Sequence, residues 1–382
     1  MDKSARFCYN TLLERVFPQS VTQRGKRIGL KENGMKKNVV VIGYGGQGGW
    51  HADHALKSDV VTLRGVYDIK EERNELARSR GIGVYASLDE ICADKDAEIC
   101  VVATPNDVHE DIVVRLLKSG HNVVCEKPVA LSVESFDRMT AAARESGKLF
   151  TVHQNRRWDV DFLAIKEIVD SGKIGAPINL ESRIHGSRGI PSDWRCHKQY
   201  GGGMILDWGV HLIDQILQII PGKIERVYCE TTHITTDEVD DGFKLLLTFE
   251  NGVRSLVEVG TYNFLALPRF YLQAKKGTAL ITDWRQNARV AYCKAWNEAD
   301  VLPVQTAAGI TKTMAPRDSI TLDEYDWTRP ASDVHDFYRN LVAAIDGKAE
   351  QIVKLPEVRR VLRVMEEAFN SAASGNAISV SI

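Results

Sequence analysis

Three side chains suited to electrostatic and acid–base chemistry stand out by type and spacing: Lys127, Asp207 and His211. Lys127 follows a Val-rich run in the tripeptide EKP, where its ammonium can polarise an alcohol or carbonyl oxygen and stabilise developing alkoxide charge. Glu126 is in place to orient that ammonium. Asp207 and His211 are spaced i, i+4 and Asp214 follows at i+7, so all three share one face of an otherwise apolar helix. The polar groups of this stripe either form hydrogen bonds within the core or face a binding site.

A glycine-rich turn supplies a second kind of chemistry. GYGGQG places Gly43, Gly45 and Gly48 in GxGxxG spacing, after a predicted strand and at the start of a predicted helix. These glycines permit a tight turn, close approach to a pyrophosphate and close helix packing, which together predict a dinucleotide site. Asp68 ends the next strand about 25 residues after Gly43. Its carboxylate favours NAD by pairing with ribose hydroxyls and repelling a 2′-phosphate, and Lys70 weakens that preference.

Two contrasting patterns must position these residues. Residues 37–155 alternate Val/Ile-rich strands with helices, which predicts a parallel, doubly wound Rossmann domain. Residues 156–382 contain strand after strand joined by short turns and end in two helices, with an edge strand over 377–382. The fold class is therefore α/β, an N-terminal Rossmann domain plus a C-terminal α+β domain with an open, largely antiparallel sheet. Residues 296–330 are expected to be irregular.

Composition narrows the class of function. The chain has 382 residues with 44% hydrophobic and 26% charged side chains. Its net charge of −2 gives no general electrostatic attraction to nucleic acid or to a membrane surface. No apolar run approaches the roughly 18–20 residues that span a bilayer. Seven scattered cysteines without a CxxC pair argue against a disulfide framework or metal cage, and we expect a cytoplasmic protein. His51 and His54, spaced i, i+3, predict helix surface because no carboxylate is placed beside them.

Residues 1–36 form a basic N-terminal extension. Apolar residues between 5 and 18 have a spacing that gives one helical face. An isolated helix of this length is marginal in water, so it requires a docking surface on the protein's own body or on a neighbouring subunit. A disordered extension is the alternative.

Five motifs carry a resemblance to a known family. They are GxGxxGxxH (43–51), TPNxxH (104–109), EKP (126–128), HQNRRW (153–158) and GGGMILDWGVHLID (201–214). In order and spacing they resemble the glucose–fructose oxidoreductase/inositol dehydrogenase/rhizopine-catabolism (Gfo/Idh/MocA) family. The resemblance implies catalysis between a Rossmann domain and an open-faced sheet domain, and a cis peptide between Lys127 and Pro128.

The resemblance also implies roles for individual residues. The catalytic residues would be Lys127, His211 and Asp207, with His211 as the proton acceptor at a pKa near neutrality. The cofactor would be held by Gly43, Gly45, Gln47, Gly48, Asp68, Thr104, Asn106, His109, Glu126, Lys127, Asn155, Trp194 and Arg195. The substrate would be bound by Lys127, Arg157, Asp207, His211 and Lys198, with Arg156 as an ordinary ion-pair partner. No metal is expected, because lysine and histidine supply the charge and the proton transfer.

The function so implied is hydride transfer between NAD and a secondary alcohol carbon of a sugar, glycoside or cyclitol. Two alternatives stay open: a redox-assisted glycosidase or lyase that recycles its NAD, and a non-catalytic cofactor-sensing regulator. The C-terminal domain (156–382) is expected to bind the substrate and to form a homo-oligomer through its open sheet.

Overall fold

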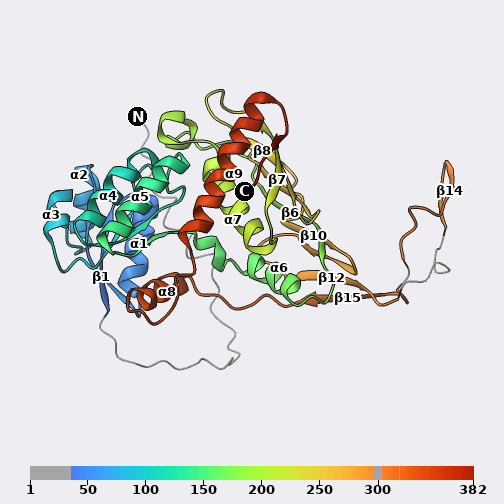
Figure 1. The fold of residues 1–382 in the computed structure, drawn as a ribbon, viewed down its shortest axis with the longest axis horizontal. Coiled ribbons are helices and arrows are strands. Elements are labelled where there is room, and N and C mark those ends of the chain that lie inside the picture. The colour runs from blue at the N-terminus through green and yellow to red at the C-terminus, as the bar shows by residue number, and fades with distance from the viewer. Residues whose placement is uncertain (1–35, 296–302, 318) are drawn as a thin grey trace, which may run out of the picture. The chain divides into compact units, whose positions relative to one another are not determined.

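A computed structural model describes residues 36–295, 303–317 and 319–382 (Figure 1). The expected helix over residues 5–18, and all of the basic extension except Lys36, lie outside these described residues.

The first domain is built on a five-stranded parallel sheet with strand order β2-β1-β3-β4-β5. Its strands are β1 (Lys37–Ile42), β2 (Val61–Tyr67), β3 (Ile99–Val102), β4 (Asn122–Cys125) and β5 (Phe150–Val152). The accompanying helices are α1 (Gly46–Lys57), α2 (Glu71–Ser79), α3 (Leu88–Ala93), α4 (His109–Lys118) and α5 (Val133–Ser146). The continuous Val runs of β1, β3 and β4 are buried on both faces, as a parallel sheet covered by helices requires.

The second domain contains a nine-stranded sheet with strand order β15-β12-β11-β10-β6-β9-β8-β7-β16. Neighbouring strands are antiparallel except β6 and β9, which are parallel. The strands are β6 (Pro177–His185), β7 (Ile224–Thr232), β8 (Gly242–Phe249), β9 (Arg254–Gly260), β10 (Phe270–Ala274), β11 (Gly277–Ile281), β12 (Ala288–Cys293), β15 (Leu322–Trp327) and β16 (Ile378–Ser379). The predicted fold class is confirmed.

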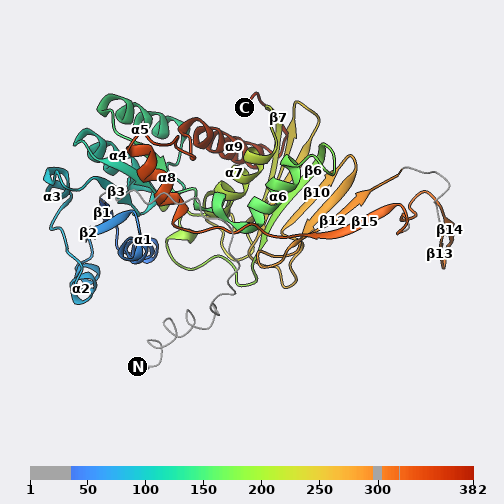
Figure 2. The same cartoon turned by 90° about the horizontal axis from the view of Figure 1, so that it is seen from below.

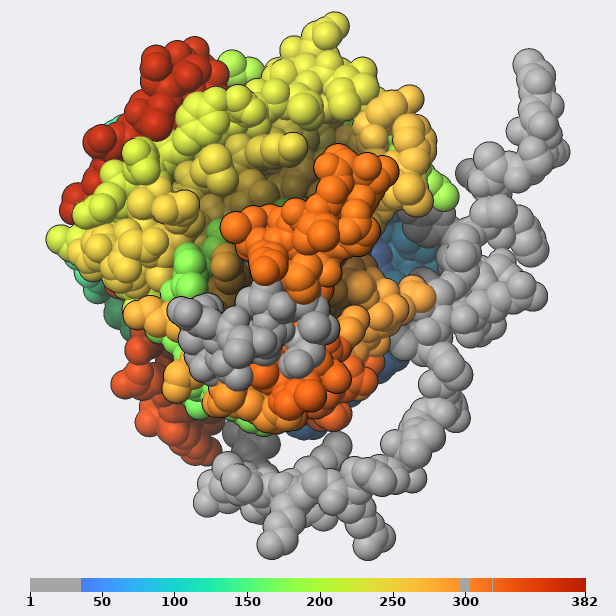
Figure 3. Space-filling view, turned by 90° about the vertical axis from the view of Figure 1, so that its right-hand side faces the viewer, coloured from blue at the N-terminus to red at the C-terminus, as the bar shows by residue number. Residues whose placement is uncertain are grey.

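Helices cover one face of this sheet. They are α6 (Val160–Asp170), α7 (Val210–Ile219) and α9 (Leu355–Ser374), and Figure 2 shows them on the same side of the strands. Their apolar side chains share one core with the inward-facing residues of the sheet. Figure 3 looks toward the other face, where the yellow and orange parts of the chain surround a hollow.

Part of the segment expected to be irregular is ordered strand. Within residues 296–330, β15 pairs with β12 at the sheet edge, and β13 (Val304–Thr306) and β14 (Gly309–Thr311) pair as a separate two-stranded sheet. The expectation was wrong for β15 because an edge strand, here LDEYDW, needs no regular apolar alternation. The expected terminal edge strand is present as β16.

The last two helices reach back to the first domain. Side chains of α8 (Asp336–Ile345) and of the start of α9 lie in the same apolar core as the Rossmann strands. They include Phe337, Tyr338, Leu341, Val358 and Leu362. None of the helices in the described part of the chain is both long and apolar enough to cross a bilayer.

Candidate active site

The glycine turn between β1 and α1 has the geometry of a phosphate cradle. Gly43 adopts φ +87°, and a Cβ on it would lie 2.5 Å from the carbonyl oxygen of Ala103. A Cβ on Gly48 would lie 1.7 Å from the carbonyl oxygen of Gly43, so helix and strand meet without room for a side chain. Gly45, by contrast, faces open space, with nothing within 4 Å of an added Cβ. A backbone free to approach a ligand at the start of a helix fits a pyrophosphate.

Two further polar groups at this edge fit the same cofactor. The Asp68 carboxylate accepts hydrogen bonds from the backbone N–H of Tyr44 at 2.7 Å and of Lys70 at 2.9 Å. These bonds fix it beside the glycine turn, where an adenosine ribose lies in Rossmann folds. The Thr104 hydroxyl, after β3, is buried with no hydrogen-bond partner, and an unpaired buried polar atom is a place where a ligand can be bound.

The Lys127 ammonium is held by one residue of the second domain. Its Nζ donates to the Asp207 carboxylate at 2.8 Å and to the Asp207 backbone carbonyl at 3.0 Å. Asp207 also accepts from Arg195 Nε at 3.1 Å. Burial alone would raise the pKa of Asp207, but the Lys127 and Arg195 charges outweigh it and hold the pKa below its ordinary value. The Lys127–Pro128 peptide is cis, as the resemblance implied.

The imidazole of His211 follows Asp207 by one turn. The chain between them is a π-helix, Ile205–Gly209, which runs into α7. His211 is 4% exposed and its Nδ1 has no hydrogen-bond partner. Burial, assisted by the charges of Lys127 and Arg156, lowers the pKa of His211 well below its ordinary value. Our expectation of a pKa near neutrality was therefore wrong, and His211 is uncharged at neutral pH.

The start of this helix is fixed by a buried acid. The Asp240 carboxylate accepts from the backbone N–H of Ile205 at 2.8 Å, and its backbone carbonyl accepts from that of Met204 at 3.0 Å. Gly203 adopts φ +101°, and a Cβ there would lie 2.3 Å from Asp240 Oδ1, so both the backbone and the space require glycine. Burial raises the pKa of Asp240 to about 7. These contacts set where Asp207 projects.

Consecutive arginines point to different surroundings. Arg157 is 6% exposed and makes two bonds to the Asp214 carboxylate, at 2.8 and 2.6 Å, and one to Glu357 at 2.6 Å. These bonds join α7 and α9 through the Arg157 guanidinium, with Asp214 as its main partner. Arg157 was expected to bind the substrate, but it does not line the site. Arg156 forms the expected ion pair, with Asp159 at 2.9 Å, and it also lines the site with its guanidinium 4.3 Å from the centre of the Trp208 ring.

The groups converge on a cavity of about 410 Å³. It is lined by Gln47, Glu126, Lys127, Asn155, Arg156, Gly189, Pro191, Arg195, Met204, Asp207, Trp208, His211 and Thr261. Seven of these were expected from the sequence. The remaining six had no signal of their own in the sequence.

Besides Arg157 and the cofactor residues described above (the three glycines, Asp68 and Thr104), four residues expected to contact ligands do not line this cavity. Asn106 donates to the carbonyl of Gly201 at 3.1 Å and so holds the 187–203 loop. The buried His109 ring lies within hydrogen-bonding distance of the carbonyls of Thr104, Pro128 and Val129, and so braces the turn after Lys127. Trp194 stacks on Arg195. Lys198 is exposed, and its backbone N–H donates to Glu238.

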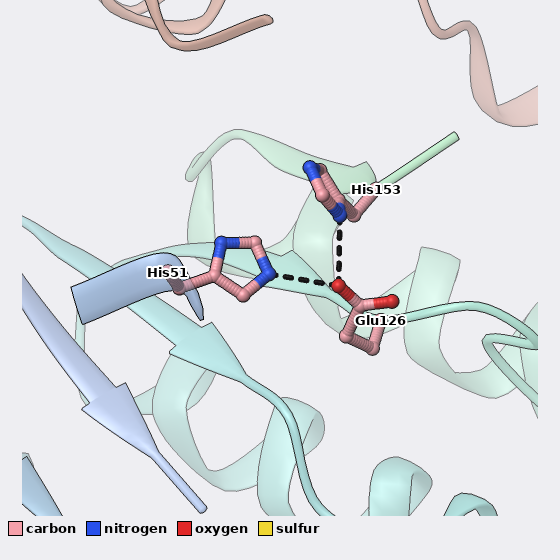
Figure 4. A group of neighbouring side chains, drawn as sticks. All are labelled: His51, Glu126 and His153. Carbon is pink, nitrogen blue, oxygen red and sulfur yellow. Dashed lines mark hydrogen bonds and ion pairs between the residues drawn. The ribbon is translucent and has the colours of Figure 1, made fainter. Parts of the chain in front are cut away.

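The Glu126 carboxylate accepts hydrogen bonds from two histidines and does not contact the Lys127 ammonium. The expectation that Glu126 orients this ammonium was therefore wrong. One of its oxygens accepts from His51 Nε2 at 2.8 Å and His153 Nδ1 at 2.7 Å, as Figure 4 shows. Its other oxygen accepts from the backbone N–H of Lys127 at 3.1 Å. The His51 ring is fully buried, contrary to the predicted helix surface, and its Nδ1 lies 2.5 Å from the hydroxyl of Tyr338.

The distances among these three side chains are those of hydrogen bonds, and they are shorter than the distances between the ligands of one metal ion. Two nitrogen or oxygen ligands of one tetrahedral ion lie roughly 3.3 Å apart, whereas both histidines approach one Glu126 oxygen within 2.8 Å. Burial lowers the pKa of His51 to about 4, so its ring is neutral, donating to Glu126 and accepting from Tyr338. Burial would raise the pKa of Glu126, but the two histidines outweigh it and the carboxylate stays ionised.

Known proteins share this architecture. An NAD-binding protein of Listeria innocua superposes with a TM-score of 0.87 at 40% identity, covering 90% of this chain and 99% of that one. The scyllo-inositol 2-dehydrogenase (NADP(+)) of Bacillus subtilis is 26% identical over 87% of this chain and 93% of its own length. An oxidoreductase of Schizosaccharomyces pombe is 34% identical over 194 residues, and the match spans about half of the yeast protein, 53%.

Two family models match consecutive parts of the chain. Residues 37–154 match the NAD-binding Rossmann fold of an oxidoreductase family, and residues 162–280 match the GFO/IDH/MocA C-terminal domain. The first part is thus an NAD-binding domain, and the cradle and polar groups described above are what such a cofactor needs. The chain belongs to the GFO/IDH/MocA family of oxidoreductases.

Proposed function

We propose that this protein oxidises a secondary alcohol of a sugar, glycoside or cyclitol, and reduces the corresponding ketone in reverse. The observation that carries the proposal is the meeting of Lys127, Asp207 and His211 in one cavity with Gln47 and Asn155 of the NAD-binding domain. The Bacillus subtilis relative is a scyllo-inositol 2-dehydrogenase, and this supports a polyol substrate. NAD, when bound, supplies the hydride acceptor.

The chain's own residues would handle the alcohol oxygen. The Lys127 ammonium, fixed 2.8 Å from the Asp207 carboxylate, can donate a hydrogen bond to that oxygen and stabilise negative charge on it. The neutral His211 can accept the hydroxyl proton, because its depressed pKa leaves it uncharged at pH 7. Asp207, whose carboxylate is itself held by Arg195, keeps the ammonium in place. In the reduction, His211 returns the proton.

The test is a panel of sugars and cyclitols with NAD, followed by NADH absorbance and by mass spectrometry of the products. Lys127→Ala should lower kcat by a factor on the order of a hundred or more and change the NAD Kd by less than about tenfold. Lys37→Ala is a matched control, since Lys37 is an equally half-buried, ion-paired lysine in β1. Wild-type kcat in the Lys127 variant would refute its role. Product formed without net NADH would instead indicate the redox-assisted glycosidase or lyase.

We also propose that the helix-free face of the nine-stranded sheet joins two copies of the chain. Helices cover the other face only, among the described residues, and Leu246 of β8 is 48% exposed. Large exposed apolar side chains on an open sheet are typical of an interface. Sedimentation at micromolar concentration should give more than the 42.6 kDa of one chain, and Leu246→Lys should weaken that assembly.

A further inference from the structure

Two tryptophans lie side by side next to the cavity. Trp208 lines the cavity itself, and the ring centroid of Trp284 lies 5.8 Å from that of Trp208. The two residues come from different elements, since Trp208 belongs to the π-helix before α7 and Trp284 to the turn between β11 and β12. Trp284 is 42% exposed. An aromatic surface therefore continues from the lining of the cavity to solvent.

A guanidinium is fixed against both rings. Arg156 Cζ lies 4.3 Å from the Trp208 ring centroid and 5.5 Å from that of Trp284. Arg156 Nη1 donates to the Asp159 carboxylate at 2.9 Å, which holds the side chain in this position. Arg329 donates to the backbone carbonyl of Trp284 at 3.0 Å and anchors the turn. The surface thus has fixed aromatic rings and a fixed hydrogen-bond donor.

We propose that Trp208, Arg156 and Trp284 form an outer subsite for a second sugar ring, linked through a glycosidic bond to the ring that is oxidised beside Lys127. The proposal rests on the proposed function and names its substrate class as glycosides and disaccharides. The C–H face of a pyranose packs on an aromatic ring, and its hydroxyl groups accept from a guanidinium. The cavity of about 410 Å³ is at the small end of ligand sites, so a two-ring substrate must extend past Trp208 toward Trp284.

The experiment compares one-ring and two-ring probes on the NAD-saturated full-length chain. Binding of glucose and cellobiose, and of galactose and lactose, is measured by titration calorimetry. In each pair that binds, the disaccharide should bind more tightly. Loss of one aromatic stacking contact is worth about 0.5–1.5 kcal/mol, or roughly twofold to thirteenfold in affinity. Trp284→Ala should lower the two-ring to one-ring affinity ratio by this factor, and Trp284→Phe should keep most of it.

A matched control and two outcomes complete the test. Phe369→Ala removes an aromatic of similar exposure, 38%, from α9 and should leave the affinity ratio as in the wild type. An equal affinity for one and two rings, no binding by any probe, or a ratio unchanged by Trp284→Ala overturns the subsite. A two-ring preference that Trp284→Ala removes, without NADH formation from any probe, supports the subsite while refuting the dehydrogenase.

Discussion

Three neighbouring glycines allow the contributions of fold and cofactor to be separated by adding one methyl group at each. In Gly48→Ala the new Cβ would meet the carbonyl oxygen of Gly43 at 1.7 Å, and this contact is with backbone, which no rotamer change relieves. In Gly45→Ala and Gly49→Ala the same atom meets nothing within 4 Å. The three changes are chemically identical and differ only in what the methyl touches.

The expected magnitudes follow from these surroundings. Overpacking of this severity costs about 3 kcal/mol, and alanine in a helix gains back about 1 kcal/mol over glycine. Gly48→Ala should therefore lose about 2 kcal/mol of unfolding free energy, a fall in Tm of roughly 4–8 °C. Gly49→Ala, inside α1, should gain up to about 1 kcal/mol. Gly45→Ala should keep the fold but weaken NAD binding on the order of tenfold, because its methyl occupies the pyrophosphate approach.

Thermal unfolding with and without NAD measures both effects in one assay. Wild-type Tm rises with NAD by mass action. That rise should shrink in Gly45→Ala and persist in Gly49→Ala, while Gly48→Ala should melt lower even without NAD. A Gly48→Ala protein with wild-type Tm and wild-type NAD affinity would refute the packing argument, and equal NAD affinities in all three variants would refute the placement of the pyrophosphate.

Cofactor choice and acid stability can be tested in the same way. Asp68→Ala should narrow the difference between the NAD and NADP dissociation constants, because it deletes the carboxylate that repels a 2′-phosphate; a wild-type protein that already prefers NADP would contradict this. Folding lowers the pKa of His51 from 6.5 to about 4. Between these two values the ring stays neutral in the folded chain but takes up a proton in the unfolded chain. The contribution of His51 to the free energy of unfolding is therefore lost as pH falls from about 6.5 toward 4. Between pH 7.5 and pH 5 the wild type should lose about 2 kcal/mol through this residue, and urea unfolding of His51→Gln should show a pH dependence smaller by that amount; an unchanged pH dependence would count against it.

The fold could be predicted because its signals are local. The buried Val runs of β1, β3 and β4 and the glycine turn each depend on residues close in sequence, and the same is true of the EKP tripeptide that carries Lys127. Residues of the candidate site that sit directly after those strands were predicted for the same reason. Gln47, Glu126 and Lys127 all line the cavity.

The misplaced residues depend on contacts that are distant in sequence or on local backbone geometry. His51 is buried because Tyr338, 287 residues later, covers it, and no helical periodicity contains that information. Arg156 lines the cavity and Arg157 does not, because both lie in a 3-10 turn, Asn155–Trp158, which sends neighbours to different sides. The pKa of His211 depends on how completely the second domain excludes water from it. Such quantities are properties of the assembled chain.

The packing of α8 and of the start of α9 into the core of the first domain has a consequence for synthesis on the ribosome. Translation delivers residues 37–155 well before Tyr338, Leu341 and Leu362, which complete their core and shield His51. N-terminal domains commonly fold while the rest of a chain is still being made. Here the core of the nucleotide-binding domain stays incomplete until α8 and α9 have been translated, so a polypeptide that terminates before them displays an open apolar surface that chaperones and proteases can recognise.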